Sequence, residues 1–326
     1  MSAYLPTAVT ALWPLAAILA ATLAAGLAIS RRPGQAVPRA AAWSLVAAST
    51  TLVERLTAEE PAGLRMLALI GTLLYAMKAV VSVDGTETGR PPLSPWRWLG
   101  FAALWPGMRP GPFASAGGPP LPGADELLKR GVVRLALGAA LVALARVAWE
   151  TTGSRFLATA VVLPGLSFIL HFGIFNLVAG AWRLAGVDVH ALFRAPLRSK
   201  SLAEFWGRRW NLAFSEMTAI GVYRPLARVA GKPAALVVAF LFSGLLHELA
   251  ISLPVRSGFG LPLLYFAIHG VLMLTERALE RAGRPVYRHP GIGRAWTTAW
   301  LVLPLPILFH RPFLRAVVWP ILGIPG

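Results

Sequence analysis

The sequence predicts an all-α polytopic membrane protein, with about eight or nine transmembrane helices plus interfacial or re-entrant helices around an intramembrane cavity. Apolar residues make up 56% of the 326 residues and charged residues only 14%, whereas soluble globular proteins carry roughly 25% charged residues. The apolar residues form long uninterrupted blocks instead of a half-buried 3.6-residue pattern. Residues 1–30 contain no charged side chain, which is long enough to cross about 30 Å of hydrocarbon.

Eight apolar blocks are candidate membrane spans. In chain order they cover residues 8–29, 40–56, 63–83, 131–149, 156–180, 233–252, 260–276 and 295–310. The second block is the weakest, because it is short and ends in Glu54 and Arg55. A shorter apolar segment, 312–324, is expected to re-enter the membrane or to complete a ninth crossing. Lys78, inside the third block, is expected to snorkel toward the cytoplasmic surface.

Basic loops predict the orientation of the chain. Residues 31–39 carry three arginines and no acid, residues 181–232 carry nine basic against three acidic residues, and residues 276–294 carry five against two. The first arginines follow the first apolar block, which is typical of a signal anchor and not of a cleavable signal peptide. The positive-inside rule then places the N-terminus outside and all three basic stretches in the cytoplasm. The net charge of +17 therefore indicates contact with anionic membrane lipids and not with nucleic acid.

Two stretches do not read as simple crossings. Residues 84–130 are rich in proline and glycine and are expected to lie at the interface, with tryptophan rings at head-group level. Their alternating aromatic and basic residues are Trp96, Arg97, Trp98, Trp105 and Arg109. Residues 196–232 are amphipathic. No internal repeat of fixed period is visible, which weakens the case for a transporter built from inverted halves. We expect a single membrane-embedded domain over residues 1–326.

The clearest candidate for chemistry is His247. It lies about 14 residues after Pro233, hence some 20 Å along a helix and inside the bilayer. Ionisable groups at that depth are functional candidates, and an imidazole can act as a base near neutral pH; a structural histidine bonded to a neighbouring helix is the alternative. Ser243 shares its helical face, but a mid-helix serine more often bonds to its own i−4 carbonyl. Glu248 points about 100° away and is expected to pair with another helix.

The second candidate segment is 201–211. Helical spacing pairs Glu204 with Arg208 at i,i+4 and places Arg208 and Asn211 on one face. Phe205, Trp206 and Trp210 supply aromatic bulk. An interfacial amphipathic helix without a catalytic role explains the same composition.

Together these segments resemble a known family. Glu-Phe-Trp-Gly-Arg-Arg-Trp-Asn ends at Asn211 and is followed, after Val222-Tyr223-Arg224-Pro225, by Ser-Gly-Leu-Leu-His-Glu. This combination within residues 200–250 is similar to the signature of the membrane-bound O-acyltransferase superfamily, in particular its wax-synthase-like branch. The resemblance implies acyl transfer from acyl-CoA to the hydroxyl of a lipophilic alcohol, with His247 as the catalytic histidine and Asn211 as its polar partner. The N-terminal half of the chain carries no matching motif.

Chemistry agrees with these roles. Acyl transfer from a thioester needs a base for the alcohol proton and a donor for the developing oxyanion; Asn211 would fill the second role or orient the substrate. The chain has no cysteine and no recognisable serine elbow, so direct attack by the alcohol is simpler than a covalent intermediate.

We expect no metal and no cofactor, with acyl-CoA as co-substrate and a lipophilic alcohol and membrane lipids as partners. Basic side chains on the predicted cytoplasmic side, Arg198, Lys200, Arg208 and Arg209, are candidates for binding the phosphates of the CoA. Further candidates for substrate binding are Trp206, Trp210, Ser243 and His171.

Three other functions remain open at this point. An acetyltransferase acting on a terpenoid, sterol or sugar hydroxyl would use the same residues with a different tunnel. A proton-coupled transporter or lipid flippase would use His247 and Glu248 as a relay. A structural scaffold is disfavoured by the buried histidine.

Overall fold

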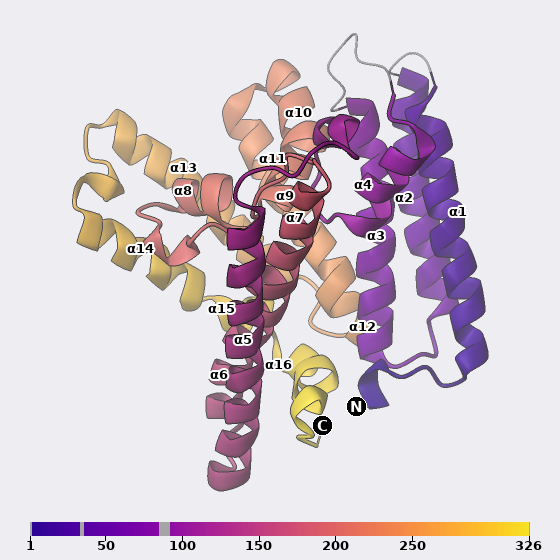
Figure 1. Ribbon diagram of the computed structural model, residues 1–326. Helices are drawn as coiled ribbons and strands as arrows, with labels where there is room; N and C mark the ends of the chain where they lie inside the picture. The colour runs from indigo at the N-terminus through magenta and orange to yellow at the C-terminus, as the bar shows by residue number, and fades with distance from the viewer. Residues whose placement is uncertain (1, 33–35, 85–91, 326) are drawn as a thin grey trace. The chain divides into compact units, whose positions relative to one another are not determined.

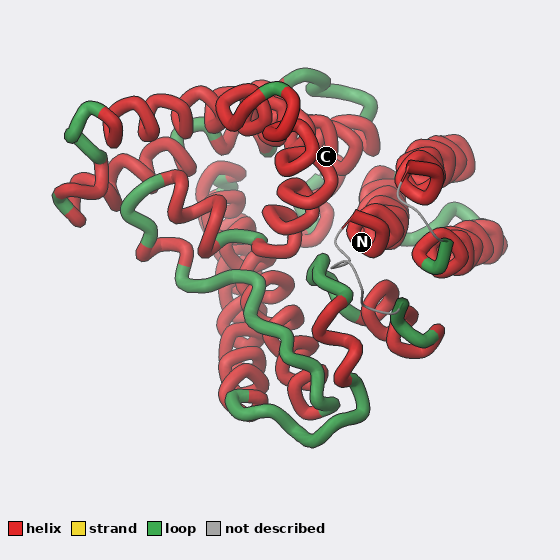
Figure 2. Tube along the Cα trace, turned by 90° about the horizontal axis from the view of Figure 1, so that it is seen from above, coloured by secondary structure: helices red, strands yellow, loops and turns green. Residues whose placement is uncertain are grey.

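The structure, a computed structural model, describes residues 2–32, 36–84 and 92–325. Every regular element in these ranges is a helix (Figure 2), which confirms the predicted all-α class. Parts of the predicted loop 31–39 and of the predicted interfacial segment 84–130 lie outside the described residues. The chain divides into two compact units, residues 1–192 with 314–326 and residues 193–313, which are described separately. The expectation of one domain over residues 1–326 stays a prediction.

Five described helical stretches are long and apolar enough to cross a membrane: Val9–Ser30, Ala62–Asp84, Ala124–Thr152, Arg155–Leu184 and Gly231–Val255. A sixth is added if Pro290–Leu308 and Arg311–Leu322, which are separated by a bend, are counted as one span. The predicted spans 40–56 and 260–276 are also helical, but they contain polar residues and are not among these candidate membrane spans. The structure thus supports a membrane protein with five or six candidate spans.

The first unit contains a group of three long helices that lie side by side (Figure 1), α1 (Leu12–Ser30), α2 (Ala36–Leu56) and α3 (Ala62–Asp84). Of the three, α3 is the most buried. Two short 3₁₀ turns, η1 (Ser2–Tyr4) and η2 (Val9–Ala11), precede this group. Helix α4 (Pro95–Leu104) packs on α1 and α3, and a Cβ on Gly26 of α1 would lie 3.0 Å from the Trp98 ring. Small residues of this kind let membrane helices approach closely.

A second group in the same unit packs around α5 (Ala124–Thr152). Three consecutive segments run along it: α6 (Arg155–Ser167), the π-helix η4 (Phe168–Ile174) and α7 (Phe175–Leu184). A Cβ on Gly138 of α5 would lie 2.7 Å from the backbone nitrogen of Ile169, so glycine is required for this close approach. The unit is completed by η3 (Gly111–Ser115), η10 (Leu314–Val318) and η11 (Trp319–Leu322).

The structure corrects the expectation for Lys78. Its side chain is fully buried, and Nζ donates hydrogen bonds to the carbonyl oxygens of Phe101 (3.0 Å), Trp105 (2.6 Å) and Gly107 (2.5 Å). The snorkelling prediction is wrong because the last turn of α4 and the residues that follow it supply three carbonyl acceptors inside the first unit. Lys78 therefore fastens α3 to the chain that follows α4.

The tryptophans of the predicted interfacial segment are also placed differently. Trp98 and Trp105 are buried and only Trp96 of the three is exposed. The indole nitrogen of Trp98 donates to Ser82 Oγ at 3.2 Å. Two of the three rings therefore pack inside the first unit, and the prediction that they lie at head-group level stays a prediction.

The second unit is built on two long helices, α11 (Gly231–His247) and α13 (Leu261–Arg281), which pack against each other. A Cβ on Gly244 of α11 would lie 2.8 Å from the Cα atom of Leu263, so the two backbones nearly touch there. The other elements, in chain order, are η5 (Pro196–Arg198), α8 (Leu202–Glu204), η6 (Phe205–Arg209), α9 (Leu212–Thr218), η7 (Ala219–Tyr223), α10 (Arg224–Val229), η8 (Glu248–Ser252), α12 (Leu253–Val255), η9 (Val286–Arg288), α14 (Pro290–Val302), α15 (Leu305–Leu308) and α16 (Arg311–Phe313).

Replacing Lys78 with methionine should destabilise the first unit by roughly 2–5 kcal/mol, because three buried carbonyl oxygens lose their donor. The thermal melting temperature of the purified protein in detergent measures this effect. Lys129→Met, at an exposed position of α5, is the matched control and should leave the melting temperature unchanged. Equal melting of both variants would show that the buried contacts of Lys78 do not stabilise the fold.

Candidate active site

His247 is the last residue of α11 and is followed directly by the π-helix η8. Its Nδ1 atom lies 2.7 Å from the carbonyl oxygen of Ser243. A carbonyl can only accept, so Nδ1 carries the hydrogen and Nε2 is left as the proton acceptor of the ring. The Ser243 hydroxyl donates to the carbonyl oxygen of Ala239 at 2.9 Å, which confirms the back-bonding expected of a mid-helix serine. The helix itself therefore sets the tautomer that a general base requires.

Aromatic side chains surround the imidazole. The His247 ring centroid lies 4.3 Å from that of Phe266 and 5.5 Å from that of Phe214. The Trp206 ring lies 5.6 Å from Phe266 and 5.4 Å from His269. We call Trp206, Phe214, Phe266 and His269 the aromatic cluster. Aromatic rings thus form much of the immediate surroundings of the imidazole.

The signature segment 205–211 is not a regular α-helix. Residues Phe205–Arg209 form the π-helix η6, in which the amide of Trp210 donates to the carbonyl oxygen of Phe205 at 2.9 Å. The wider turn moves the side-chain partner from i+4 to i+5, so Glu204 pairs with Arg209, with Oε1 2.7 Å from Nε. The predicted pair of Glu204 with Arg208 is therefore wrong, and Arg208 is exposed. π-Helical turns of this kind are frequent at functional sites.

Asn211 ends this segment with a left-handed backbone, φ 42°. Its Oδ1 accepts the amide of Phe214 at 3.3 Å and thereby caps α9, a favoured role for asparagine. The prediction that Arg208 and Asn211 share one helical face is wrong, because the helix stops between them. The cap does not use the side-chain NH₂ of Asn211.

Asn211 and His247 lie in the same unit, and Phe214 contacts both of them. The amide of Phe214 binds Asn211, and the Phe214 ring packs on His247. The described residues contain no direct hydrogen bond between the two predicted catalytic side chains. Trp206 belongs to the aromatic cluster, whereas Trp210 stacks on Phe205 (5.4 Å between centroids).

Two buried glutamates that sequence reasoning did not assign to the site hold it together. Glu276, on α13, accepts the backbone amides of Leu202 (2.7 Å) and Ala203 (3.0 Å) and the indole N–H of Trp296 (3.0 Å). It thus fastens the start of the signature segment to α13. The only sequence feature that could have pointed to this role is the position of Glu276 at the end of the apolar block 260–276.

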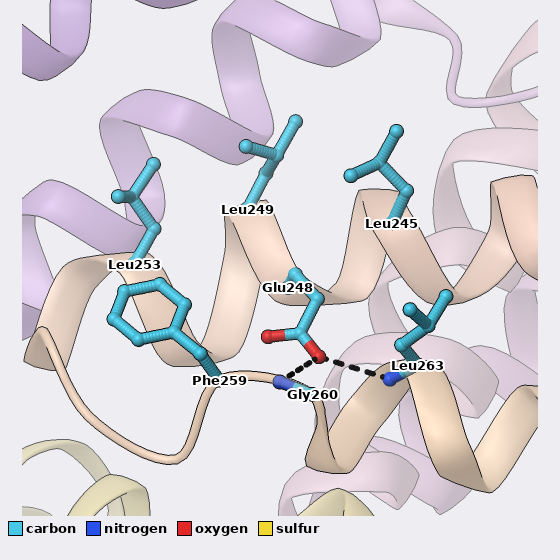
Figure 3. A pocket seen from close by; sticks show the side chains of 7 residues that line it. All are labelled: Leu245, Glu248, Leu249, Leu253, Phe259, Gly260 and Leu263. Atoms are coloured by element: carbon cyan, nitrogen blue, oxygen red, sulfur yellow. Dashed lines mark hydrogen bonds between the residues drawn. The ribbon is translucent and has the colours of Figure 1, made fainter.

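The second is Glu248. Its Oε1 atom accepts the amides of Gly260 (2.9 Å) and Leu263 (3.0 Å) at the N-terminus of α13 (Figure 3). A carboxylate is stabilised there by unpaired N–H groups and by the helix dipole. Glu248 therefore pairs with another helix, as predicted, and the described residues contain no hydrogen bond between it and His247.

The remaining candidates lie apart from the aromatic cluster or in the other unit. Arg198 is exposed, and the backbone amide of Lys200 donates to Glu204 Oε2 at 2.8 Å. His171 belongs to η4 of the first unit, where its Nδ1 lies 3.0 Å from Ser167 Oγ. Their predicted contacts with substrate stay predictions.

Arg209 and Arg208 form a matched pair for mutation. Arg209→Ala removes the ion pair with Glu204 and a hydrogen bond to the carbonyl oxygen of Arg194 (3.2 Å), so it should lower stability by about 1 kcal/mol. Arg208→Ala should leave stability unchanged because that side chain is exposed. Thermal melting in detergent measures both effects. A larger loss of stability in Arg208→Ala than in Arg209→Ala would contradict the i+5 pairing.

The same ion pair predicts a pH dependence. Burial alone would raise the pKa of Glu204, but the Lys200 amide and the Arg209 guanidinium outweigh it and lower this pKa. A lowered folded pKa gives stability that is complete above the unfolded value of about 4.3 and is lost as the pH falls through the folded value. The difference in melting temperature between wild type and Glu204→Gln should stay constant from about pH 7 to 5 and shrink below about pH 4. A difference that grows on acidification would contradict the pairing.

Part of the second unit is similar in sequence to known proteins. Residues 189–268 match the membrane bound O-acyl transferase family, and this range contains Asn211 and His247. The chain is 32% identical over 136 residues to the long-chain-alcohol O-fatty-acyltransferase of Simmondsia chinensis, covering 36% of this chain and 39% of the relative. It is 32% identical over 139 residues to the probable long-chain-alcohol O-fatty-acyltransferase 6 of Arabidopsis thaliana, covering 37% and 40%. The chain thus spans about two fifths of the length of the curated relatives it matches. The similarity to the membrane bound O-acyl transferase family thus lies in residues 189–268.

Proposed function

We propose that this protein transfers a fatty acyl group from acyl-CoA to the hydroxyl of a long-chain alcohol and so forms a wax ester. The observation that carries the proposal is His247, which lies within the family match, is lined by aromatic rings and keeps Nε2 as its proton acceptor. The names of the relatives support a long-chain alcohol as acceptor and a fatty acyl group as the transferred group. The proposed setting is one membrane domain of eight or nine crossings around an intramembrane cavity.

The proposed reaction needs one base and one oxyanion donor. Nε2 of His247 takes the proton of the alcohol hydroxyl while the oxygen attacks the thioester carbonyl carbon. The tetrahedral intermediate then collapses, the C–S bond breaks, and the imidazolium returns the proton to the CoA sulfur. Because no cysteine is present, direct attack is preferred over a thioester intermediate on the enzyme.

Asn211 is proposed as the oxyanion donor or as the group that orients the substrate. Its Oδ1 is fixed by the Phe214 amide, so the orientation of the side-chain NH₂ is fixed as well. A donor held in place before the reaction stabilises developing charge without reorganisation. Phe214 binds Asn211 through its amide and packs its ring on His247. The same short segment therefore holds the proposed donor in place and contacts the imidazole.

The nucleotide end of acyl-CoA is proposed to bind on the cytoplasmic side, where Arg198 and Arg208 are exposed. Arg209 is less available, since Glu204 already holds its guanidinium. This orientation rests on the basic loops 31–39, 181–232 and 276–294 and on the positive-inside rule. A proton relay through Glu248 finds no support, because the Oε1 of that carboxylate binds the N-terminus of α13.

His247→Ala should lower the rate of CoA release at least 100-fold, which is the usual loss when a general base is removed. Asn211→Ala should lower it by roughly 10²-fold, as for loss of one oxyanion donor. The measurement is thiol release by the purified protein, with palmitoyl-CoA or acetyl-CoA as donor and hexadecanol as acceptor. A preference for palmitoyl-CoA favours wax-ester synthesis, and a preference for acetyl-CoA favours the acetyltransferase alternative.

His289→Ala is the control, because His289 is an exposed histidine of the same unit outside the proposed machinery. It should release CoA at the wild-type rate. If wild type and His247→Ala release CoA at equal rates, His247 is not the base. If neither protein releases CoA with any alcohol, the acyltransferase proposal fails.

A further inference from the structure

One end of the second unit is built from two segments that lie far apart in the chain. The turn η5 packs on α14, and η9 packs on both α13 and α14. A Cβ on Gly293 would overlap the carbonyl oxygen of Lys200 and would lie 3.2 Å from the Cα atom of Tyr287, so glycine is required where these backbones meet. The chain around residues 197–200 therefore lies against residues 287–294.

The charge of this surface is positive. Residues 281–294 contain four arginines and no acid. Arg284, Arg288 and Arg294 are exposed, and none of their three guanidinium groups forms an ion pair with another described residue. The acid that precedes the stretch, Glu280, accepts the hydrogen of a tyrosine hydroxyl at 2.6 Å. The arginines are thus left to a partner outside the unit.

Large apolar side chains are exposed on the same surface. Leu197 is 82% exposed, Ile292 is 63% exposed and Tyr287 is 43% exposed. Leu197 belongs to the short turn η5, and Ile292 lies in the first turn of α14, two residues before Arg294. Each exposed apolar side chain left in water forfeits the free energy of burial. The surface therefore combines unpaired positive charge with apolar groups that lack cover.

The position in the chain is that of a membrane interface. The helical stretch Pro290–Leu308 is the first half of a candidate span that Arg311–Leu322 completes. Ile292 and the arginines beside it lie at the start of this stretch, where a span ends and lipid head groups begin.

We propose that this surface docks on the head groups of an anionic phospholipid leaflet. The arginines bind lipid phosphates, while Leu197 and Ile292 enter the boundary of the acyl chains. We call it the basic patch, and its residues are Leu197, Arg284, Tyr287, Arg288, Ile292 and Arg294.

The composition of the basic patch favours a lipid surface over other anions. Guanidinium groups bind phosphate oxygens in pairs, and apolar side chains interleaved with basic ones are typical of segments that lie in the head-group layer. The nucleotide of CoA would use the charges but would leave Leu197 and Ile292 in water. The positive-inside rule requires charge in a loop and no apolar side chains beside it. The proposal does not depend on acyl transfer.

The test uses a fluorophore whose emission reports the polarity around it. The chain has no cysteine, so Ile292→Cys provides one site for an NBD label. The labelled full-length protein is placed in nanodiscs of POPC alone or of POPC with about one third POPG, as an anionic leaflet. POPG should move the NBD emission to shorter wavelength, because the label leaves water. Val271→Cys in α13 is the matched control at 62% exposure, and its emission should be the same in both nanodiscs.

Charge variants in the Ile292→Cys background test the role of the arginines. Each arginine at an anionic surface strengthens binding about fivefold, so Arg288→Gln with Arg294→Gln should remove the shift. Arg288→Lys with Arg294→Lys keeps the charge and should retain most of it. Arg228→Gln with Lys232→Gln is the matched control, because these basic residues are exposed in the same unit and lie outside the basic patch. It should show the full shift, and equal melting temperatures check that all variants are folded.

Equal NBD emission in the two nanodiscs would overturn the proposal. A shift that survives the loss of both patch arginines, or one that disappears equally in the Arg228 and Lys232 control, would do the same. A shift produced in pure POPC by free CoA, with none from POPG, would assign the surface to a soluble phosphate ligand instead. The readout requires no turnover, so a failure of the proposed acyl transfer leaves this test unchanged.

Discussion

The close contact between α11 and α13 at Gly244 is the constraint on which the candidate site depends. The backbones meet there because glycine leaves no Cβ between Gly244 and Leu263, the packing that membrane helices favour. This approach places Phe266 of α13 against His247 of α11. Glu248 binds the first turn of α13, and Glu276 near its other end holds the signature segment. One helix therefore positions the base, its apolar wall and the segment that carries Asn211.

A histidine in such a place is useful for acyl transfer to an alcohol for two physical reasons. The carbonyl of Ser243 fixes the hydrogen on Nδ1, so Nε2 can accept a proton without a prior change of tautomer. The rings of Phe214 and Phe266 pack against the imidazole, which would disfavour water as a competing nucleophile. The family match over residues 189–268 covers His247, Ser243 and the aromatic cluster except His269, whereas the N-terminal part of the chain lies outside it.

The sequence predicted what depends on local pattern and missed what depends on long-range contacts or on irregular helices. Apolar blocks located the helices that pass through Lys78 and His247, and the spacing of Ser243 explained its own hydrogen bond. The helical pairing of Glu204 with Arg208 was wrong because a π-turn adds one residue, and a period of 3.6 cannot show this. The partners of Lys78 and Glu276 lie 20 or more residues away along the chain, so a short window of sequence does not contain both halves of these contacts.

The measurement that tests the central claim most directly is the fate of the alcohol oxygen. Purified protein is incubated with palmitoyl-CoA and hexadecanol labelled with ¹⁸O, and the ester is analysed by mass spectrometry. Direct attack by an alcohol deprotonated at His247 predicts a wax ester that retains ¹⁸O in its alkoxy position, formed by wild type and not by His247→Ala. An ester without ¹⁸O, or the same labelled ester from both proteins, would contradict the account.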